Sequence, residues 1–278
     1  MRAAGVYSLI VKGQGVAQCY ERPQWRSAGD VDFFLDPENY DKAKAILIPL
    51  ASTVDMEDRR RLHQGMTIDS WTVELHGTMH TELSSRINAG VDAVQRDIFL
   101  NSQVRVWGNS GVEVFLPAPN NDAIIIFTHI LEHFFIGGIG LRQICDWCRL
   151  LWTYRDQIDP SILGQWLNDM GIMSEWRAFG SFAVSYLGMP ADAMPFYKSS
   201  SCFDRKARRI CRVILKTGNL GHNQDNSYRS KYPKFIEKSI TFWRRMGEFA
   251  YLTTIFPLDG PRFFRTYVIR RTRAAIKL

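Results

Sequence analysis

Two aspartates separated by one residue are the clearest chemical feature of this sequence. They are Asp30 and Asp32 in the segment GDVDFFLD, where alternation and aromatic residues predict a strand. Side chains two apart on a strand point to the same face, so the two carboxylates converge. Neighbouring carboxylates repel unless a cation lies between them, and oxygen ligands of this kind suit Mg²⁺ or Mn²⁺. An acidic turn before an ordinary strand has the same pattern. The interpretation as a metal site therefore requires a further ligand elsewhere in the chain.

A third carboxylate lies about forty residues later. Glu74 stands in WTVELHG, within an expected strand over residues 67–76 that places Val73 and Leu75 on one face and Glu74 and His76 on the other. A third acid on a neighbouring strand completes a two-metal site, whose ions lie roughly 3.5 to 4 Å apart and hold the attacking and leaving oxygens of a phosphoryl transfer. His76 either borders this site or is a structural histidine.

Basic and glycine residues near the aspartates suit a phosphate group. Lys12 and Gly13 stand where the expected strand VYSLIV passes into a helix, and helix N-termini bind phosphate. Gly29 allows a close approach of backbone and ligand at the start of the next strand. Arg26 either holds a phosphate through its planar guanidinium or pairs with Glu21 or Asp36 as a loop arginine.

The order of the expected elements indicates an α+β fold. A small mixed sheet with helical cover is expected over residues 1–120, followed by an α-helical domain over residues 121–278. The strands are expected at 6–11, 30–36, 67–76 and 112–116, and helices at 14–20 and 37–52, with a polar segment at 78–110. Breaks at glycine and proline predict helices at 121–135, 139–156, 159–170, 173–187 and 203–217.

These motifs together resemble a known group of enzymes. The order KG, helix, RSAGDVDFF, helix, VELH resembles the nucleotidyltransferases of the DNA polymerase β-like superfamily. More narrowly, the chain resembles a bacterial family of uncharacterised nucleotidyltransferases over residues 5–222, at the segments VKGQGVAQCYERPQWRSAGDVDFFLD, VELH, HILEHFFIGGIGLRQICDWCRLL and TGNLGHN.

The resemblance implies an enzyme that moves a nucleoside monophosphate from a nucleoside triphosphate to a hydroxyl acceptor and releases pyrophosphate. It implies that Asp30, Asp32 and Glu74 ligate the metal ions and that Lys12 and Gly13 face the triphosphate. The usual pair in the superfamily is glycine with serine or glycine, so here Lys12 replaces the serine contact or stabilises the turn. Relatives usually have helices before the first strand, which implies a start further upstream.

The acceptor is left open by the sequence. A small alcohol or sugar, a protein side chain and an RNA end all remain candidates. The pattern KG followed by R-S-x-x-D-x-D also resembles a group of toxins, which makes transfer to tRNA an alternative. A nucleotide-binding module without turnover is the other alternative.

Two further motifs have a competing chemical interpretation. His129, Glu132 and His133 match H-x-x-E-H, a zinc-peptidase signature, but a peptidase needs a third ligand from a later helix. We expect His129 and His133 to line a cleft between the sheet and the helices, with Arg142 and Asp146 paired one turn apart. The C-x-x-C pair Cys145 and Cys148 lies inside an expected helix, and no second pair follows, which favours a place in the core.

Charge and cysteine content bear on partners and location. The formal net charge is +7, from 35 basic and 28 acidic residues, and residues 261–278 hold six basic residues and no acid. That tail is expected to be a helix whose cations face solvent, an anionic membrane or RNA. Five irregularly spaced cysteines favour a reducing compartment. The most apolar stretch, residues 123–141, contains His129, Glu132 and His133, which would be costly to place in the hydrocarbon of a membrane. We therefore expect no membrane span and a cytoplasmic location.

Overall fold

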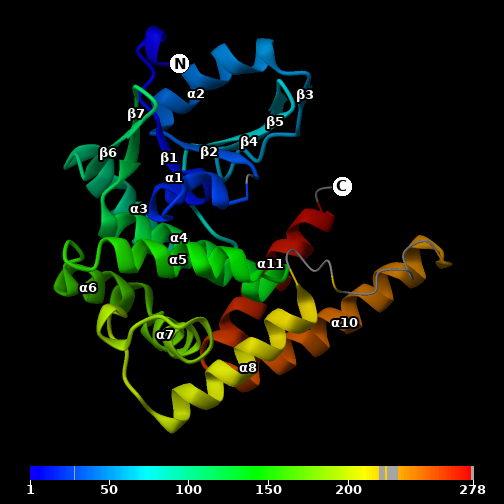
Figure 1. Ribbon diagram of the computed structural model, residues 1–278. Coiled ribbons are helices and arrows are strands. Elements are labelled where there is room, and N and C mark those ends of the chain that lie inside the picture. Colours follow the sequence, from blue (N-terminus) through cyan, green and yellow to red (C-terminus); the bar gives the residue numbers. More distant parts are fainter. Residues whose placement is uncertain (28, 219–222, 224–230, 277–278) are drawn as a thin grey trace.

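The chain has an α+β architecture, with a mixed sheet near the N-terminus and a body of helices (Figure 1). The computed structural model describes residues 1–27, 29–218, 223 and 231–276, with side chains as far as residue 269. The expected α+β class is therefore confirmed. None of the described helices combines the length and the apolar character that a membrane crossing requires.

The central sheet has five strands in the order β1 (Leu9–Val11), β2 (Val31–Phe34), β5 (Trp71–His76), β4 (His63–Ile68) and β3 (Thr53–Val54). Neighbouring strands are antiparallel except β2 and β5, which run parallel. The register of this parallel pair places Asp32 opposite Glu74. The chain between β2 and β5 therefore has to cross over the sheet, and α2 (Pro37–Leu47) begins this crossover.

The two faces of the sheet pack against different partners. Figure 1 shows α2 above the sheet and the helical body below it. Val73 and Leu75 belong to a small core with Tyr40 of α2. Phe34 and Leu9 face the other way and join the large core of the helical body. The alternation along β5 thus leaves Glu74 and His76 on the face toward the body, as the sequence predicts.

The expectation of a single strand over residues 67–76 is wrong. The chain turns at Asp69 and Ser70 and makes the hairpin of β4 and β5. Both turn residues have positive φ, 47° and 68°, as a tight hairpin turn requires, and neither is the glycine that usually marks such a turn.

The expected polar segment at 78–110 also contains regular structure. It holds α3 (Ser85–Leu100) and β6 (Val104–Asn109), which pairs with β7 (Val112–Pro117). In α3, Ser84 caps the first turn, and Ile87, Val91, Val94 and Ile98 bury one face of the helix.

Five helices of the body are confirmed with small shifts in their ends. They are α4 (Pro119–Ile136), α5 (Leu141–Thr153), α6 (Pro160–Met170), α7 (Met173–Leu187) and α8 (Ser201–Thr217). Phe127 of α4 stacks on Trp147 of α5 and meets Trp176 of α7 edge to face, which fixes the centre of the body. The large core joins sheet and helices without a break at residue 120, and the division into residues 1–120 and 121–278 stays a prediction.

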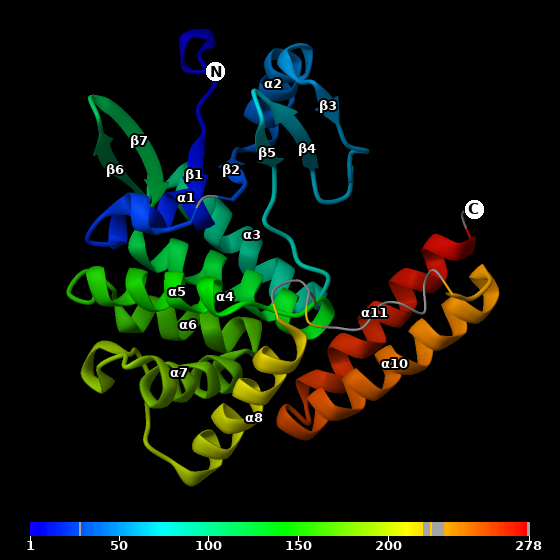
Figure 2. The ribbon, with the colours of Figure 1, turned by 45° about the vertical axis from the view of Figure 1, so that its right-hand side comes forward.

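The C-terminal part forms a pair of helices. The sequence did not predict α10 (Lys234–Ile255), whereas α11 (Asp259–Ile276) includes the expected tail helix. The two lie side by side and extend away from the rest of the body (Figure 2). Phe249 of α10 contacts Phe264 and Tyr267 of α11. The side chains of Arg270, Arg271, Arg273 and Lys277, as well as most of TGNLGHN, lie outside the described residues.

Candidate active site

The structure brings the three predicted carboxylates together. Asp32 on β2 and Glu74 on β5 lie opposite each other, and Asp30 directly precedes β2. One oxygen from each carboxylate lies within 4.8 Å of the others. This convergence follows from strand alternation combined with the parallel pairing of β2 and β5.

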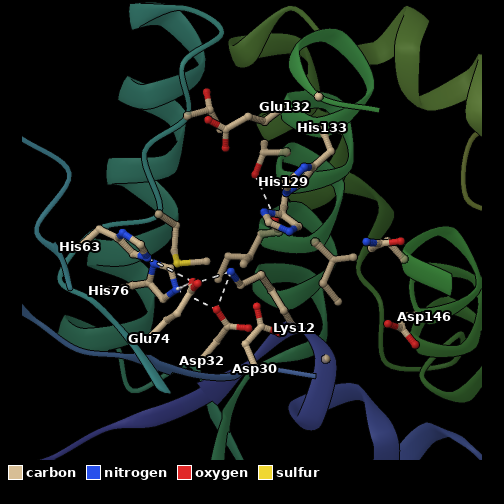
Figure 3. A pocket seen from close by; sticks show the side chains of 18 of the residues that line it. Lys12, Asp30, Asp32, His63, Glu74, His76, His129, Glu132, His133 and Asp146 are labelled. Carbon is tan, nitrogen blue, oxygen red and sulfur yellow. Dashed lines mark hydrogen bonds and ion pairs between the residues drawn. The ribbon is translucent and has the colours of Figure 1, made fainter. Parts of the chain in front are cut away.

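The carboxylates lie in a cleft of about 550 Å³ between the sheet and the helical body. Figure 3 shows His129 and His133 of α4 across the cleft from Asp30 and Asp32. The lining also includes almost every other residue singled out from the sequence, namely Lys12, Gly13, Arg26, Glu74, His76, Arg142 and Asp146. Of the predicted site residues, Gly29 is absent from the lining.

Lys12 places its ammonium group among the carboxylates. Its Nζ lies 2.7 Å from Asp32 Oδ1, and both side chains are buried. Burial alone would lower the pKa of Lys12, but the negative charges of Asp32 and Glu74 outweigh it and raise that pKa above its usual value. Lys12 also has a φ of 53°, an uncommon conformation for a residue other than glycine. This backbone turn accompanies the inward position of the ammonium group.

The ionisation of the carboxylates depends on these partners. Burial would raise the pKa of Asp32, but Lys12 and a hydrogen bond from His76 lower it. Glu74 is half-buried, which would raise its pKa, but hydrogen bonds from His63 and His76 hold that pKa well below the usual range. Both groups are therefore ionised at neutral pH.

Asp30 shows that Lys12 alone does not balance the cluster. Burial and the negative charges of Asp32 and Glu74 raise the pKa of Asp30, although Lys12 acts in the opposite direction. A divalent cation among the three carboxylates would relieve this repulsion. The residues present fit such an ion, because carboxylate oxygens are the donors that Mg²⁺ and Mn²⁺ take.

Arg26 has a different partner from the ones considered in the sequence. Its Nη2 lies 2.9 Å from Asp146 Oδ2, and Tyr20 donates a hydrogen bond to the other oxygen of Asp146. The predicted pair of Asp146 with Arg142 is therefore wrong, as is the pairing of Arg26 with Glu21 or Asp36. Arg26 and Asp146 are 120 positions apart, so no local pattern indicates this pair. The ion pair of Arg26 with Asp146 therefore connects the loop before β2 to α5.

The two glycines have different surroundings. A Cβ at Gly13 would lie 2.8 Å from Nη1 and Nη2 of Arg26, so glycine allows the guanidinium to pack over the turn after Lys12. A Cβ at Gly29 would meet Arg142 Nη2 at 3.8 Å, an ordinary contact, so no neighbour in the described part of the chain requires glycine there. Arg142 lines the cleft and forms no ion pair with a described residue.

His63 is a site residue that the sequence did not reveal. It lies on β4 directly opposite His76, and its Nε2 is 3.1 Å from Glu74 Oε2. His76 Nε2 lies 2.8 Å from Asp32 Oδ1, which places His76 at the site. The signal for His63 was the hairpin of β4 and β5, because pairing along it puts the two histidines side by side.

The H-x-x-E-H motif of α4 is not arranged as a peptidase centre. Glu132 accepts hydrogen bonds from the backbone N–H of Glu82 and from Arg61. Neither His129 nor His133 belongs to a cluster of metal-ligating atoms among the residues described. Their rings are 4.3 Å apart and face the cleft, as expected.

A family model described as uncharacterised nucleotidyltransferase matches residues 1–186. The chain belongs to this family. The match covers the sheet, the cleft and α4 to α6, together with nearly all of α7. No curated protein and no solved structure matches the chain.

We predict that the free energy of unfolding of this nucleotidyltransferase falls at acidic pH because of a histidine in the cleft. Burial and the positive charges of Lys12 and Arg61 lower the pKa of His133 to about 4. The unfolded chain therefore binds a proton between pH 6.5 and 4 that the folded protein rejects, and the free energy of unfolding falls as the pH falls through this window. His133→Gln should remove up to about 1.4 kcal/mol of this fall for each pH unit.

Urea unfolding at pH 7 and at pH 4.5 measures this effect. His80→Gln is the matched control, since His80 pairs with Asp92 and does not line the cleft. Equal pH dependence in wild type and His133→Gln would contradict the prediction.

Proposed function

We propose that this nucleotidyltransferase moves a nucleoside monophosphate from a nucleoside triphosphate to a hydroxyl acceptor, with Mg²⁺ or Mn²⁺ as cofactor. The observation that supports the proposal is the convergence of Asp30, Asp32 and Glu74 within 4.8 Å. The acceptor oxygen forms a bond to the α-phosphorus, the bond from that phosphorus to the bridging oxygen breaks, and pyrophosphate leaves. The metal ions supply charge neutralisation and alignment of the reacting groups.

Metal binding, acceptance of the hydroxyl proton and triphosphate binding are assigned to different residues of the cleft. Asp30 and Asp32 hold the ions. Glu74 stays ionised at neutral pH, as both a ligand and an acceptor of the hydroxyl proton must. In the free protein Lys12 acts as the counter-ion of Asp32, and Arg142, which lines the same cleft, offers a cation to the triphosphate. Positioning and charge supply most of the catalysis in such reactions.

Arg26 and Arg142, two of the arginines that line the cleft, should respond differently to substitution. Arg142→Ala should weaken triphosphate binding by about 1 to 3 kcal/mol, the scale of a charged hydrogen bond, with little change in stability. Arg26→Ala leaves Asp146 buried without its cation, so it should lower the free energy of unfolding by about 3 kcal/mol. Calorimetric titration with a non-hydrolysable triphosphate and urea unfolding separate the two effects. The opposite result would be an Arg26→Ala protein that is stable but binds the triphosphate weakly, together with an Arg142→Ala protein that binds it as the wild type does. That result would assign triphosphate binding to Arg26 and not to Arg142.

The proposal is tested by incubating the protein with each α-labelled triphosphate, Mg²⁺ or Mn²⁺, and a cell lysate. We expect release of pyrophosphate and transfer of label to one class of acceptor, with neither in a parallel sample of Asp32→Asn. Absence of pyrophosphate release with every triphosphate would favour the non-catalytic nucleotide-binding module.

A polyanionic acceptor such as RNA is the second candidate, supported by the distribution of charge. Residues 201–278 contain 18 basic and 5 acidic residues, whereas residues 1–200 contain 17 basic and 23 acidic residues. The basic region therefore begins with α8 rather than with the tail. A cavity of about 720 Å³ beside α8 and α10 is lined by Arg212, Lys216, Arg244 and Arg245, and it shares Gly137 with the active-site cleft.

The labelling experiment separates the acceptors. Label in RNA, with binding that weakens steeply as salt increases, supports this candidate. Label in protein or in a small alcohol excludes it.

A further inference from the structure

We propose that this nucleotidyltransferase has a second, mixed nitrogen and oxygen metal site formed by His63, Glu74 and His76, which prefers a divalent transition-metal ion to Mg²⁺. The inference rests on the proposed metal-dependent function and goes beyond the three carboxylates that the resemblance implies. It assigns a role to His63, which no motif in the sequence indicated.

The strand pairing places the three donors on one face of the sheet. His63 on β4 lies opposite His76 on β5, and Glu74 is two residues before His76. The Nε2 atoms of His63 and His76 lie 3.1 and 3.4 Å from Glu74 Oε2. Metal–ligand bonds of about 2.0 to 2.2 Å place neighbouring donors about 3 Å apart, so both distances between imidazole and carboxylate suit one ion. One ligand atom of each of the three residues lies within 4.8 Å of the others.

The chemistry of the donors sets the preference for the metal. Imidazole nitrogen suits zinc, iron and the other later transition metals, whereas Mg²⁺ takes carboxylates, carbonyls and water. A set of two histidines and one carboxylate therefore favours a transition-metal ion. Asp30 and Asp32, with oxygen donors only, remain suitable for Mg²⁺.

Glu74 belongs to both groups of donors. One oxygen of Glu74 lies within 4.8 Å of oxygens of Asp30 and Asp32, and one also lies within that range of both imidazoles. A carboxylate shared in this way can join two neighbouring ions, the arrangement that a two-metal phosphoryl transfer uses. The two ions would then differ in ligands, one held by oxygen alone and the other by nitrogen and oxygen.

Other interactions of these histidines define the competing interpretation. His76 Nε2 lies 2.8 Å from Asp32 Oδ1 and 3.5 Å from Lys12 Nζ. In this competing interpretation the histidines only donate hydrogen bonds to the carboxylates, and their nitrogens bind no metal. A measurement of nitrogen bonded directly to the metal distinguishes the two cases.

Pulsed electron paramagnetic resonance of the full chain loaded with Mn²⁺ provides this measurement. We expect coupling to directly bonded imidazole nitrogen in the wild type, a loss of part of it in His63→Ala, and no change in the matched control His80→Ala. We also expect the ratio of Mn²⁺ to Mg²⁺ affinity to fall in His63→Ala. His63 is half-buried at the end of a strand, so urea unfolding checks that this variant remains folded.

Two results would overturn the inference. One is the absence of nitrogen coupling in the wild type when Mn²⁺ is in excess of two ions per chain, so that the carboxylate site is filled as well. The other is nitrogen coupling that persists unchanged in both His63→Ala and His76→Gln. Neither result depends on turnover. Pyrophosphate release with oxygen-only coordination would leave the proposed function standing, whereas nitrogen coupling without pyrophosphate release would leave the metal site standing.

Discussion

Asp32→Asn and Glu74→Gln should each reduce pyrophosphate release by about a hundredfold to a thousandfold. Each change removes a negative charge that the metal ions and the transition state depend on, and single electrostatic contacts to a transition state are worth up to about a thousandfold. Asp32 and Glu74 lie opposite each other on parallel strands, so the loss of either breaks the cluster. Steady-state assays with labelled triphosphate, at saturating Mg²⁺, measure the effect.

The matched control is Asp92→Asn, which removes an acid that pairs with His80 outside the cleft. The carboxylate variants should differ in stability. Asp30→Asn relieves repulsion and should leave the protein as stable as the wild type or more so, whereas Asp32→Asn takes the partner from the buried Lys12 and should destabilise it. Full activity of Asp32→Asn would end the hypothesis of a catalytic carboxylate cluster.

Lys12→Met should lower the free energy of unfolding by about 3 kcal/mol in the presence of a chelator. The change keeps the length of the side chain but leaves Asp32 as a buried carboxylate without its cation, the situation in which breaking an ion pair is most costly. Urea unfolding in a metal-free buffer measures the loss. The double variant Lys12→Met, Asp32→Asn should recover much of it, because no charge then remains unpaired at this position.

Mn²⁺ should stabilise Lys12→Met more than it stabilises the wild type. The divalent ion neutralises the same carboxylates that the ammonium group neutralises in the free protein. Equal stability of Lys12→Met and wild type without metal would show that the ion pair contributes nothing to folding.

Local patterns were sufficient to predict the carboxylates and most of the body. Strand alternation, a property of nearest neighbours alone, predicted that Asp30 and Asp32 share one face of their strand and that Glu74 and His76 share one face of theirs. The parallel pairing of β2 and β5 then places Asp32 opposite Glu74. The ends of α6 and α7 follow from Gly171 and Gly188, both of which have positive φ at the helix C-terminus. The helices of the body were predicted well because a single glycine or proline is enough to mark where a helix ends.

Interactions between distant residues were not predictable in the same way. The ion pair of Arg26 with Asp146 joins the loop before β2 to α5, and no periodic pattern connects them. His63 was missed because the turn at Asp69 and Ser70 lacks the glycine that usually marks a two-residue hairpin, so β4 and β5 resembled one strand. The helix α10 was missed for another reason: Phe235 is 81% and Trp243 is 71% exposed, so its apolar residues do not mark one buried face.

The alignment of β2 with β5 connects the stability of the protein to its chemistry. Val73 and Leu75 pack beneath α2, whereas Glu74 between them faces the cleft. A shift of one residue between the strands would turn the carboxylate into the apolar layer and the apolar side chains into the cleft. The packed layer beneath α2 therefore also sets the distance between Asp32 and Glu74. Under the proposed function, we expect substitutions in that layer to reduce activity without removing a carboxylate.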